Sequence, residues 1–238
     1  MNNKAKIFFS YAWGDDDEKE ESREQVVNEL YESLKKEDYN LVRDKVDLGY
    51  KGFISDFMTR IGKGDLVIVV LSKKYVKSAY CMFELYEVAR NSKFEKELFR
   101  QKVLPIVVEF VNFTDTLVLE EYFEYWEDLH LKWDKLVEKR KRQLSQEQFD
   151  RYEKIKLIHQ NFGKLADWLV DMNTLSKKLL SANDFKIIKE NIEEYQNKSL
   201  ENISKEQLEN QENTDNATYI KSNVIKGDNN GNITNNFS

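Results

Sequence analysis

The stretch DLVIVVLS at residues 65–72 is a continuous apolar run, rich in valine and isoleucine, between an aspartate and a serine. A strand with one face in water alternates apolar and polar side chains, whereas a strand buried on both faces reads as an unbroken apolar run. Sheets of that kind are parallel and are covered by helices on both sides. The stretch therefore predicts a central strand of an α/β sheet.

Shorter strand and helix patterns alternate on either side of this run. Further strands are expected at KIFFSY (6–11), YNLVRD (39–44) and KVLPIVVEF (102–110). Helices are expected at residues 21–37, 53–61 and 74–91, where apolar side chains recur every three or four positions. This alternating order implies right-handed crossovers and a parallel α/β sheet flanked by helices.

The pattern changes after residue 115, where glycine and proline become rare. Apolar stripes at helical spacing then cover residues 119–137, 149–169 and 187–192. We interpret these stripes as packing faces of a helical C-terminal extension rather than as a cofactor site.

These patterns divide the chain into three parts. Residues 1–195 are expected to form one domain, with an α/β core at 1–115 followed by the helical extension. Residues 196–218 are almost entirely polar, which is typical of a flexible linker. Residues 219–238 combine β-branched residues with asparagine and glycine. That composition favours either a disordered or hairpin-like tail, or a self-association segment that stacks with like segments of other chains.

The composition excludes several functional classes. The 238 residues include 37 Lys and Arg against 43 Asp and Glu, which gives a net charge of −6. An acidic chain without a concentrated basic stripe is a poor candidate for binding nucleic acid, and acidic stretches flank the basic segment 132–143. No apolar run approaches the ~18 residues of a membrane span. We therefore expect a soluble, cytoplasmic protein that does not contact a membrane.

Cysteine and histidine are scarce. The single cysteine, Cys81, excludes a disulfide within the chain and fits a reducing compartment. His130 and His159 lie far apart in the sequence, without the cysteine or close-spaced histidine neighbours of a zinc site. No metal site is expected.

One acidic residue stands in an apolar setting. Glu84 lies in SAYCMFELYE (78–87), and buried carboxylates are rare unless they are paired or take part in chemistry. In parallel sheets, sites form beyond the carboxyl ends of the strands, and the helix that carries Glu84 follows the central strand. The sequence leaves two alternatives, an exposed helix glutamate beside an apolar face or a functional carboxylate.

Three motifs occur in chain order: FFSYAW at the end of the first strand, DxxDLGxxG from Asp44 to Gly52, and C-x-x-E from Cys81 to Glu84. Together they resemble the Toll/interleukin receptor (TIR) domain, particularly its bacterial branch, clearly over about the first 110 residues. The resemblance implies a flavodoxin-like fold. Enzymatic members cleave NAD⁺ at the nicotinamide–ribose bond, so the resemblance implies that Glu84 is the catalytic glutamate. The chain departs from many members at Tyr80, where they have tryptophan.

The resemblance also implies where the substrate binds. Residues at strand ends or beside Glu84 are the substrate-binding candidates, and they are Ser10, Tyr11, Ala12, Arg43, Asp44, Asp47, Lys51, Ser72, Tyr80 and Cys81. The loop residues among them could meet phosphates or a neighbouring subunit. Turn capping by Asp44 and Asp47 is an equally good interpretation of the loop motif. No cofactor is expected, because NAD⁺ is the substrate.

A single carboxylate suits this chemistry. The glycosidic nitrogen of NAD⁺ is already cationic, so nicotinamide leaves as a neutral molecule and needs no general acid, unlike the leaving group of an O-glycosidase. What remains is to stabilise an oxocarbenium-like ribose, which a carboxylate shielded from water does well.

Two functions from different classes follow from the resemblance. The first is NAD⁺ glycohydrolysis in bacterial anti-phage defence, activated by self-association or by an upstream sensor protein, with linear or cyclic ADP-ribose as product. The second is a non-catalytic adaptor that binds other TIR domains. The first is the leading interpretation and the second the alternative, and the sequence does not separate the linear from the cyclic product.

Overall fold

The computed structural model describes residues 4–13, 23–43, 54–109, 111–140, 143–172, 175–176 and 183–201. The chain divides into two units, Met1–Ile192 and Glu193–Ser238. The sheet and the helices that cover it belong to the first unit. Within the second unit, residues 193–201 are described and are helical.

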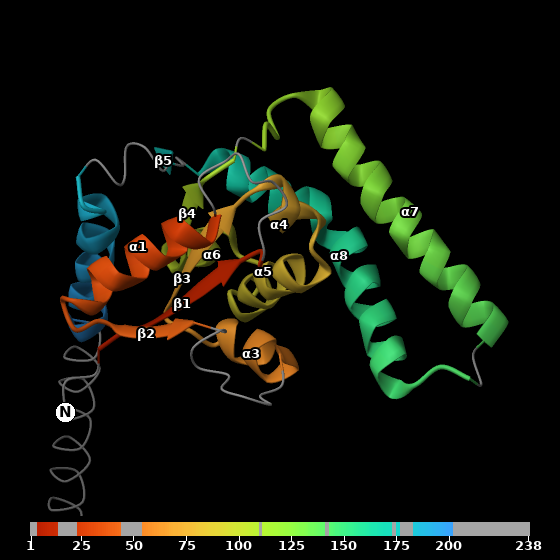
Figure 1. Ribbon diagram of the computed structural model, residues 1–238, viewed down its shortest axis with the longest axis horizontal. Helices are drawn as coiled ribbons and strands as arrows, with labels where there is room; N and C mark the ends of the chain where they lie inside the picture. The colour runs from red at the N-terminus through yellow and green to blue at the C-terminus, as the bar shows by residue number, and fades with distance from the viewer. Residues whose placement is uncertain are drawn as a thin grey trace, which may run out of the picture. The chain divides into compact units, whose positions relative to one another are not determined.

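The first unit is built on a parallel sheet in the order β2-β1-β3-β4-β5 (Figure 1). The strands are β1 (Lys6–Tyr11), β2 (Asn40–Arg43), β3 (Leu66–Leu71), β4 (Val103–Val107) and β5 (Leu175–Ser176). β3 is buried along its whole length and pairs with β1 and β4. The continuous apolar run therefore marks a central strand, and the predicted parallel α/β sheet is confirmed.

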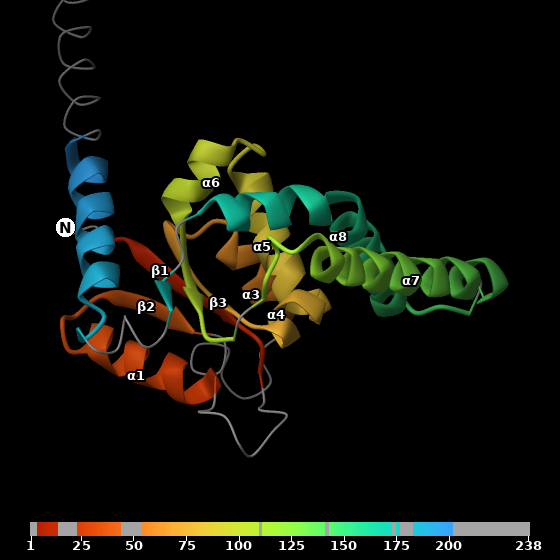
Figure 2. The ribbon, with the colours of Figure 1, turned by 90° about the horizontal axis from the view of Figure 1, so that it is seen from above.

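Helices cover both faces of this sheet. The helices of this unit are α1 (Arg23–Lys35), α3 (Ile54–Ile61), α4 (Lys73–Lys77), α5 (Ala79–Asn91), α6 (Lys96–Lys102), α7 (Thr116–Arg140), which packs on α8 and α4, and α8 (Gln146–Asp171), and residues 186–192 are also helical. The side chains of β1 alternate between the faces. The ring of Phe8 meets Phe57 of α3 at 5.6 Å between centroids, whereas the ring of Phe9 meets Tyr31 of α1 at 5.8 Å. Figure 2 shows α1 on one side of the sheet and α5 with α8 on the other.

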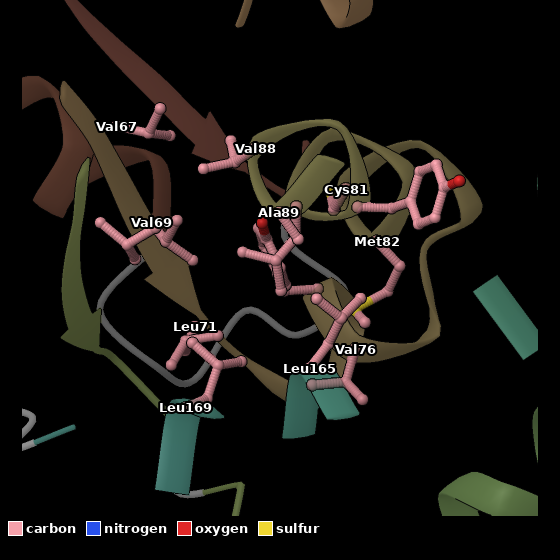
Figure 3. Close-up of a cluster of buried hydrophobic side chains, with 14 of the residues drawn as sticks. Val67, Val69, Leu71, Val76, Cys81, Met82, Val88, Ala89, Leu165 and Leu169 are labelled. Atoms are coloured by element: carbon pink, nitrogen blue, oxygen red, sulfur yellow. The ribbon is translucent and has the colours of Figure 1, made fainter. Parts of the chain in front are cut away.

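α5 is buried on nearly all sides because it lies between the sheet and α8. Val67 and Leu71 of β3 point toward it from the sheet, and Leu165 and Leu169 of α8 close the same apolar cluster from outside (Figure 3). The predicted helical extension thus forms an outer layer over the α/β core.

The prediction of one helix over 74–91 is wrong, because serine caps divide it into α4 and α5. Ser72 accepts a hydrogen bond from the Tyr75 amide at 3.1 Å, and Ser78 accepts one from the Cys81 amide at 3.3 Å. Each serine takes up a backbone donor that is orphaned at a helix start. The break turns the chain immediately before the helix that carries Glu84.

Two further elements were not predicted. α6 has a single buried residue, Phe99, and β5 is a two-residue strand that pairs with β4. Neither is long enough to set up a periodic pattern. The predicted tail, residues 219–238, lies outside the described residues, as does the linker beyond residue 201. Among the helices in the described ranges, none has the length and hydropathy to cross a membrane.

Candidate functional site

Glu84 lies in the second turn of α5, and its side chain faces the sheet. The residue is only 5% exposed. Its Oε2 accepts a hydrogen bond of 2.6 Å from the hydroxyl of Ser10, which is 1% exposed near the carboxyl end of β1. The candidate carboxylate is therefore a buried group tied to the central part of the sheet.

Tyr75 extends this contact into a chain of three residues. Its hydroxyl lies 2.9 Å from the Ser10 Oγ, and its side chain is fully buried. Burial raises the pKa of Tyr75 well above its ordinary value, nearby negative charge on Cys81 and Glu84 would raise it further, and the Ser10 hydrogen bond opposes the shift. We name Tyr75, Ser10 and Glu84 the carboxylate cluster.

Sequence reasoning missed Tyr75. The available signal was the apolar pair Tyr75–Val76 in the lysine-rich stretch KKYVK, directly after the central strand. Both residues are fully buried.

The carboxylate cluster can do specific chemistry. An ionised carboxylate only accepts hydrogen bonds, and here a neutral hydroxyl orients one of its oxygens. Electrostatic attraction is stronger in a buried site than in water. The arrangement suits the stabilisation of positive charge that develops on a bound substrate.

Other sequence candidates on this side of the sheet take different places. Ala12 and Cys81 are buried in the same apolar cluster, whereas Tyr80 is 47% exposed. Ser72 is fully buried and caps α4. Of these four, Ala12 follows the same strand as Ser10, and Cys81 lies one helical turn before Glu84.

Tyr11 and Arg43 lie on the opposite face of the sheet, toward α1. Arg43 donates from Nε to the Tyr11 hydroxyl at 2.9 Å and from a terminal nitrogen to Asn28 Oδ1 at 2.6 Å. Its guanidinium also lies over the rings of Tyr11 at 5.1 Å and Tyr31 at 5.9 Å. We name Tyr11, Asn28, Tyr31 and Arg43 the guanidinium cluster. The sheet separates it from Glu84.

The loop candidates Asp44, Asp47 and Lys51 fall outside the described residues and stay predictions. No group of three or more potential ligands is arranged to hold a metal in the part of the chain that the structure describes. His130 and His159, which are distant in sequence, stack at 4.8 Å between centroids because α7 and α8 pair as a hairpin.

One comparison with known proteins agrees with this fold. A protein-family model described as TIR domain matches residues 7–144, more than half of the chain. Among solved structures, the chain is similar to the TIR domains in the structure of the activated Roq1 resistosome directly recognizing the pathogen effector XopQ. The two share 19% sequence identity with a TM-score of 0.45, and the match covers 84% of this chain and 99% of the other. A search of the curated proteins finds no match.

Proposed function

The chain belongs to the TIR domain family, and from that premise we propose that it hydrolyses NAD⁺ at the nicotinamide–ribose bond, with Glu84 as the catalytic carboxylate. The observation that carries this proposal is the burial of Glu84 at 5% exposure with its Oε2 held at 2.6 Å by Ser10. A structural surface glutamate would need neither the burial nor the oriented donor.

The reaction needs little from the protein beyond charge and geometry. The bond between ribose C1′ and the pyridinium nitrogen breaks, the bonding electrons pass to nitrogen, and nicotinamide leaves neutral. Glu84 stabilises the oxocarbenium-like ribose that remains. Water then bonds to C1′ and loses a proton, which gives ADP-ribose. Attack by a nitrogen of the adenine instead would give a cyclic product from the same intermediate.

Ser10 has a supporting role in this mechanism. Its hydrogen bond to Oε2 orients the Glu84 carboxylate toward the side on which the ribose would bind. Ala12, two residues later at the same strand end, would line the approach to the ribose. Because Ala12 has no polar side-chain atom, it excludes water without competing for the carboxylate.

We further propose that activity depends on self-association, in a cytoplasmic bacterial defence setting in which NAD⁺ depletion halts an infected cell. An upstream sensor protein would then act by promoting assembly. If the asparagine-rich segment 219–238 drives assembly, its deletion lowers activity most at low protein concentration. An unchanged assembly state after the deletion removes that role from the segment.

Nicotinamide release from NAD⁺ over a protein concentration series tests the function. Glu84→Gln keeps the size of the side chain and an oxygen for Ser10 but removes the charge, so we expect release to fall by about a thousandfold. Glu87→Gln is the matched control, because Glu87 is a second buried carboxylate on α5. A protein that self-associates but releases no nicotinamide at any concentration would be the adaptor instead.

A further inference from the structure

We propose that Tyr75 is a positioning residue for Glu84, because its hydroxyl sets the direction of the Ser10 hydrogen bond and thereby holds the carboxylate in one orientation. This inference rests on the proposed function and names a residue that the catalytic step needs without touching the substrate. The inference depends on which hydroxyl donates its hydrogen in each contact of the carboxylate cluster.

Each hydroxyl in the cluster has one hydrogen to donate. Ser10 donates its hydrogen to Glu84 Oε2 at 2.6 Å, so its contact of 2.9 Å with the Tyr75 hydroxyl must be one in which Ser10 accepts. Tyr75 therefore donates to Ser10, and Ser10 donates to Glu84. Both hydrogen bonds point toward the carboxylate.

The reverse direction is unfavourable. Among the described residues, Ser10 is the only hydrogen-bond partner of the Tyr75 hydroxyl. If Ser10 turned its hydrogen toward Tyr75, the phenolic hydrogen would be buried without an acceptor, and Glu84 Oε2 would lose the Ser10 hydrogen bond. A buried donor without a partner is costly, so Tyr75 keeps the Ser10 hydrogen on Glu84.

Burial makes the direction persistent. Tyr75, Ser10 and Glu84 are 0%, 1% and 5% exposed, so the partners are shielded from exchange with bulk water. Because burial raises the pKa of Tyr75 above its ordinary value of 10.0, the phenol is protonated and remains a donor at neutral pH. A hydroxyl that accepts one hydrogen bond is a stronger donor in the next, especially in a low-dielectric interior.

The extension holds Tyr75 in place. α4 begins at the Ser72 cap, and its far end is held by α7 through two hydrogen bonds to backbone carbonyls. Trp126 Nε1 donates to the Val76 carbonyl at 3.1 Å, and the Tyr125 hydroxyl donates to the Lys77 carbonyl at 2.9 Å. The backbone on both sides of Tyr75 is thus fixed, which places its hydroxyl opposite Ser10.

Tyr75→Phe tests the proposal because it removes only the hydroxyl. The pH at which the Glu84 carboxyl titrates is followed by NMR in protein labelled with ¹³C at glutamate carboxyl carbons, with Glu84→Gln identifying the signal. Losing the oriented donor disfavours the ionised form, so Glu84 should titrate at higher pH in Tyr75→Phe than in the wild type. We also expect kcat for nicotinamide release to fall about tenfold with a smaller change in KM.

Tyr86→Phe is the matched control. Tyr86 is buried at 8% exposure on the same helix as Glu84, its ring stacks on Phe83, and its hydroxyl makes no hydrogen bond among the described residues. This variant should titrate as the wild type does. Incorporation of 3-fluorotyrosine at Tyr75 keeps the shape but makes a stronger donor, so it should move the Glu84 titration to lower pH.

The outcomes separate the inference from the proposed function. An unchanged Glu84 titration in both the Tyr75→Phe and the fluorotyrosine proteins overturns the positioning role. In a Ser10→Ala background, Tyr75→Phe should cause no additional shift, and an additional shift would contradict the route through Ser10. If the wild type releases no nicotinamide, the proposed function fails, while the NMR titration still decides the role of Tyr75.

Discussion

Ser10 and Tyr11 are neighbours in β1, yet they belong to two different clusters on opposite faces of the sheet. The carboxylate cluster lies under α5 and is built around an acceptor, Glu84. The guanidinium cluster lies under α1 and is built around a donor, Arg43, which contacts a phenol, an amide oxygen and two aromatic rings. Both hold a buried charge beside a tyrosine hydroxyl.

The sign of the charge decides which cluster suits the proposed reaction. Ribose offers hydroxyl donors and develops positive charge when nicotinamide leaves, so it complements a carboxylate and would be repelled by a guanidinium. We therefore interpret the guanidinium cluster as structural support for β1 and β2. The alternation of side chains along a strand, and not closeness in sequence, sorts residues into one site or the other.

The largest expected effect is on the guanidinium cluster. Arg43→Met fills the space but removes the donor to the buried Tyr11 hydroxyl and the cation–π contacts with the rings of Tyr11 and Tyr31, so the free energy of unfolding should fall by about 3 kcal/mol. Urea unfolding measures this loss. Turnover per folded molecule should change far less than stability, and a large fall in kcat in fully folded protein would place Arg43 in the substrate site.

Ser10→Ala should have the opposite effect, because we expect it to lower turnover more than the free energy of unfolding. It removes the donor at 2.6 Å from Glu84, and a hydrogen bond to a charged group contributes about 2 to 3 kcal/mol. If that contribution orients the catalytic carboxylate, nicotinamide release falls roughly a hundredfold. Steady-state kinetics and unfolding curves on the same sample would show whether Ser10→Ala lowers kcat in protein that is still folded. Equal losses of stability in Ser10→Ala and Arg43→Met would contradict the division into a catalytic cluster and a structural cluster.

Trp126→Phe tests whether α7 supports the carboxylate cluster through α4. It keeps an aromatic ring in a fully buried position, but the ring is smaller and the hydrogen bond of 3.1 Å to the Val76 carbonyl is lost, so the cost is about 2 kcal/mol. Because α4 carries Tyr75, the same change should lower kcat a few-fold. Thermal unfolding and nicotinamide release are the measurements, and a stability loss without any kinetic effect would uncouple α7 from the carboxylate cluster.

The smallest effect concerns Glu87, which lies one turn beyond Glu84 and contacts Arg90 at 2.5 Å. Burial raises the pKa of Glu87, although Arg90 partly opposes the shift. An acid whose pKa is raised on folding contributes stability below its unfolded pKa and loses it as pH rises through the folded pKa. Relative to wild type, Glu87→Gln should therefore gain stability as pH rises from about 4, where a free glutamate titrates, toward neutral pH. Unfolding curves across that range check the sign, and a gain that grows toward acid pH would contradict it.

Much of the fold follows from local pattern. The apolar run of β3 predicts a strand buried on both faces because every side chain in it must avoid water. Alternation in β1 was also sufficient to place Tyr11 on the face opposite Ser10, although the sequence motif suggested a shared site. The break between α4 and α5 was missed because Ser78 fits within a helical spacing until its side chain caps a backbone amide.

The rest depends on contacts between distant residues. β5 forms because a two-residue segment pairs with the edge of β4. Two residues are too few to show a repeating pattern of apolar side chains. The role of Tyr75 depends on a contact with Ser10, 65 positions earlier, and buried tyrosines are more often packing residues than hydrogen-bond donors to a site. The sequence could therefore single out Glu84 and Ser10 as candidates, but not the hydrogen bond that joins them or the contact of Ser10 with Tyr75.

The outer layer over α5 has a consequence for how this protein can be recombined with others. The family match ends at residue 144, but Leu165 and Leu169 of α8 still cover the apolar cluster beneath α5. A gene fusion joined at the end of the family match would expose the helix that carries Glu84 to water. The smallest transplantable module therefore extends past α8 and β5 to Ile192, where the first unit ends, and an exchange of the extension between relatives must carry its own α5 along.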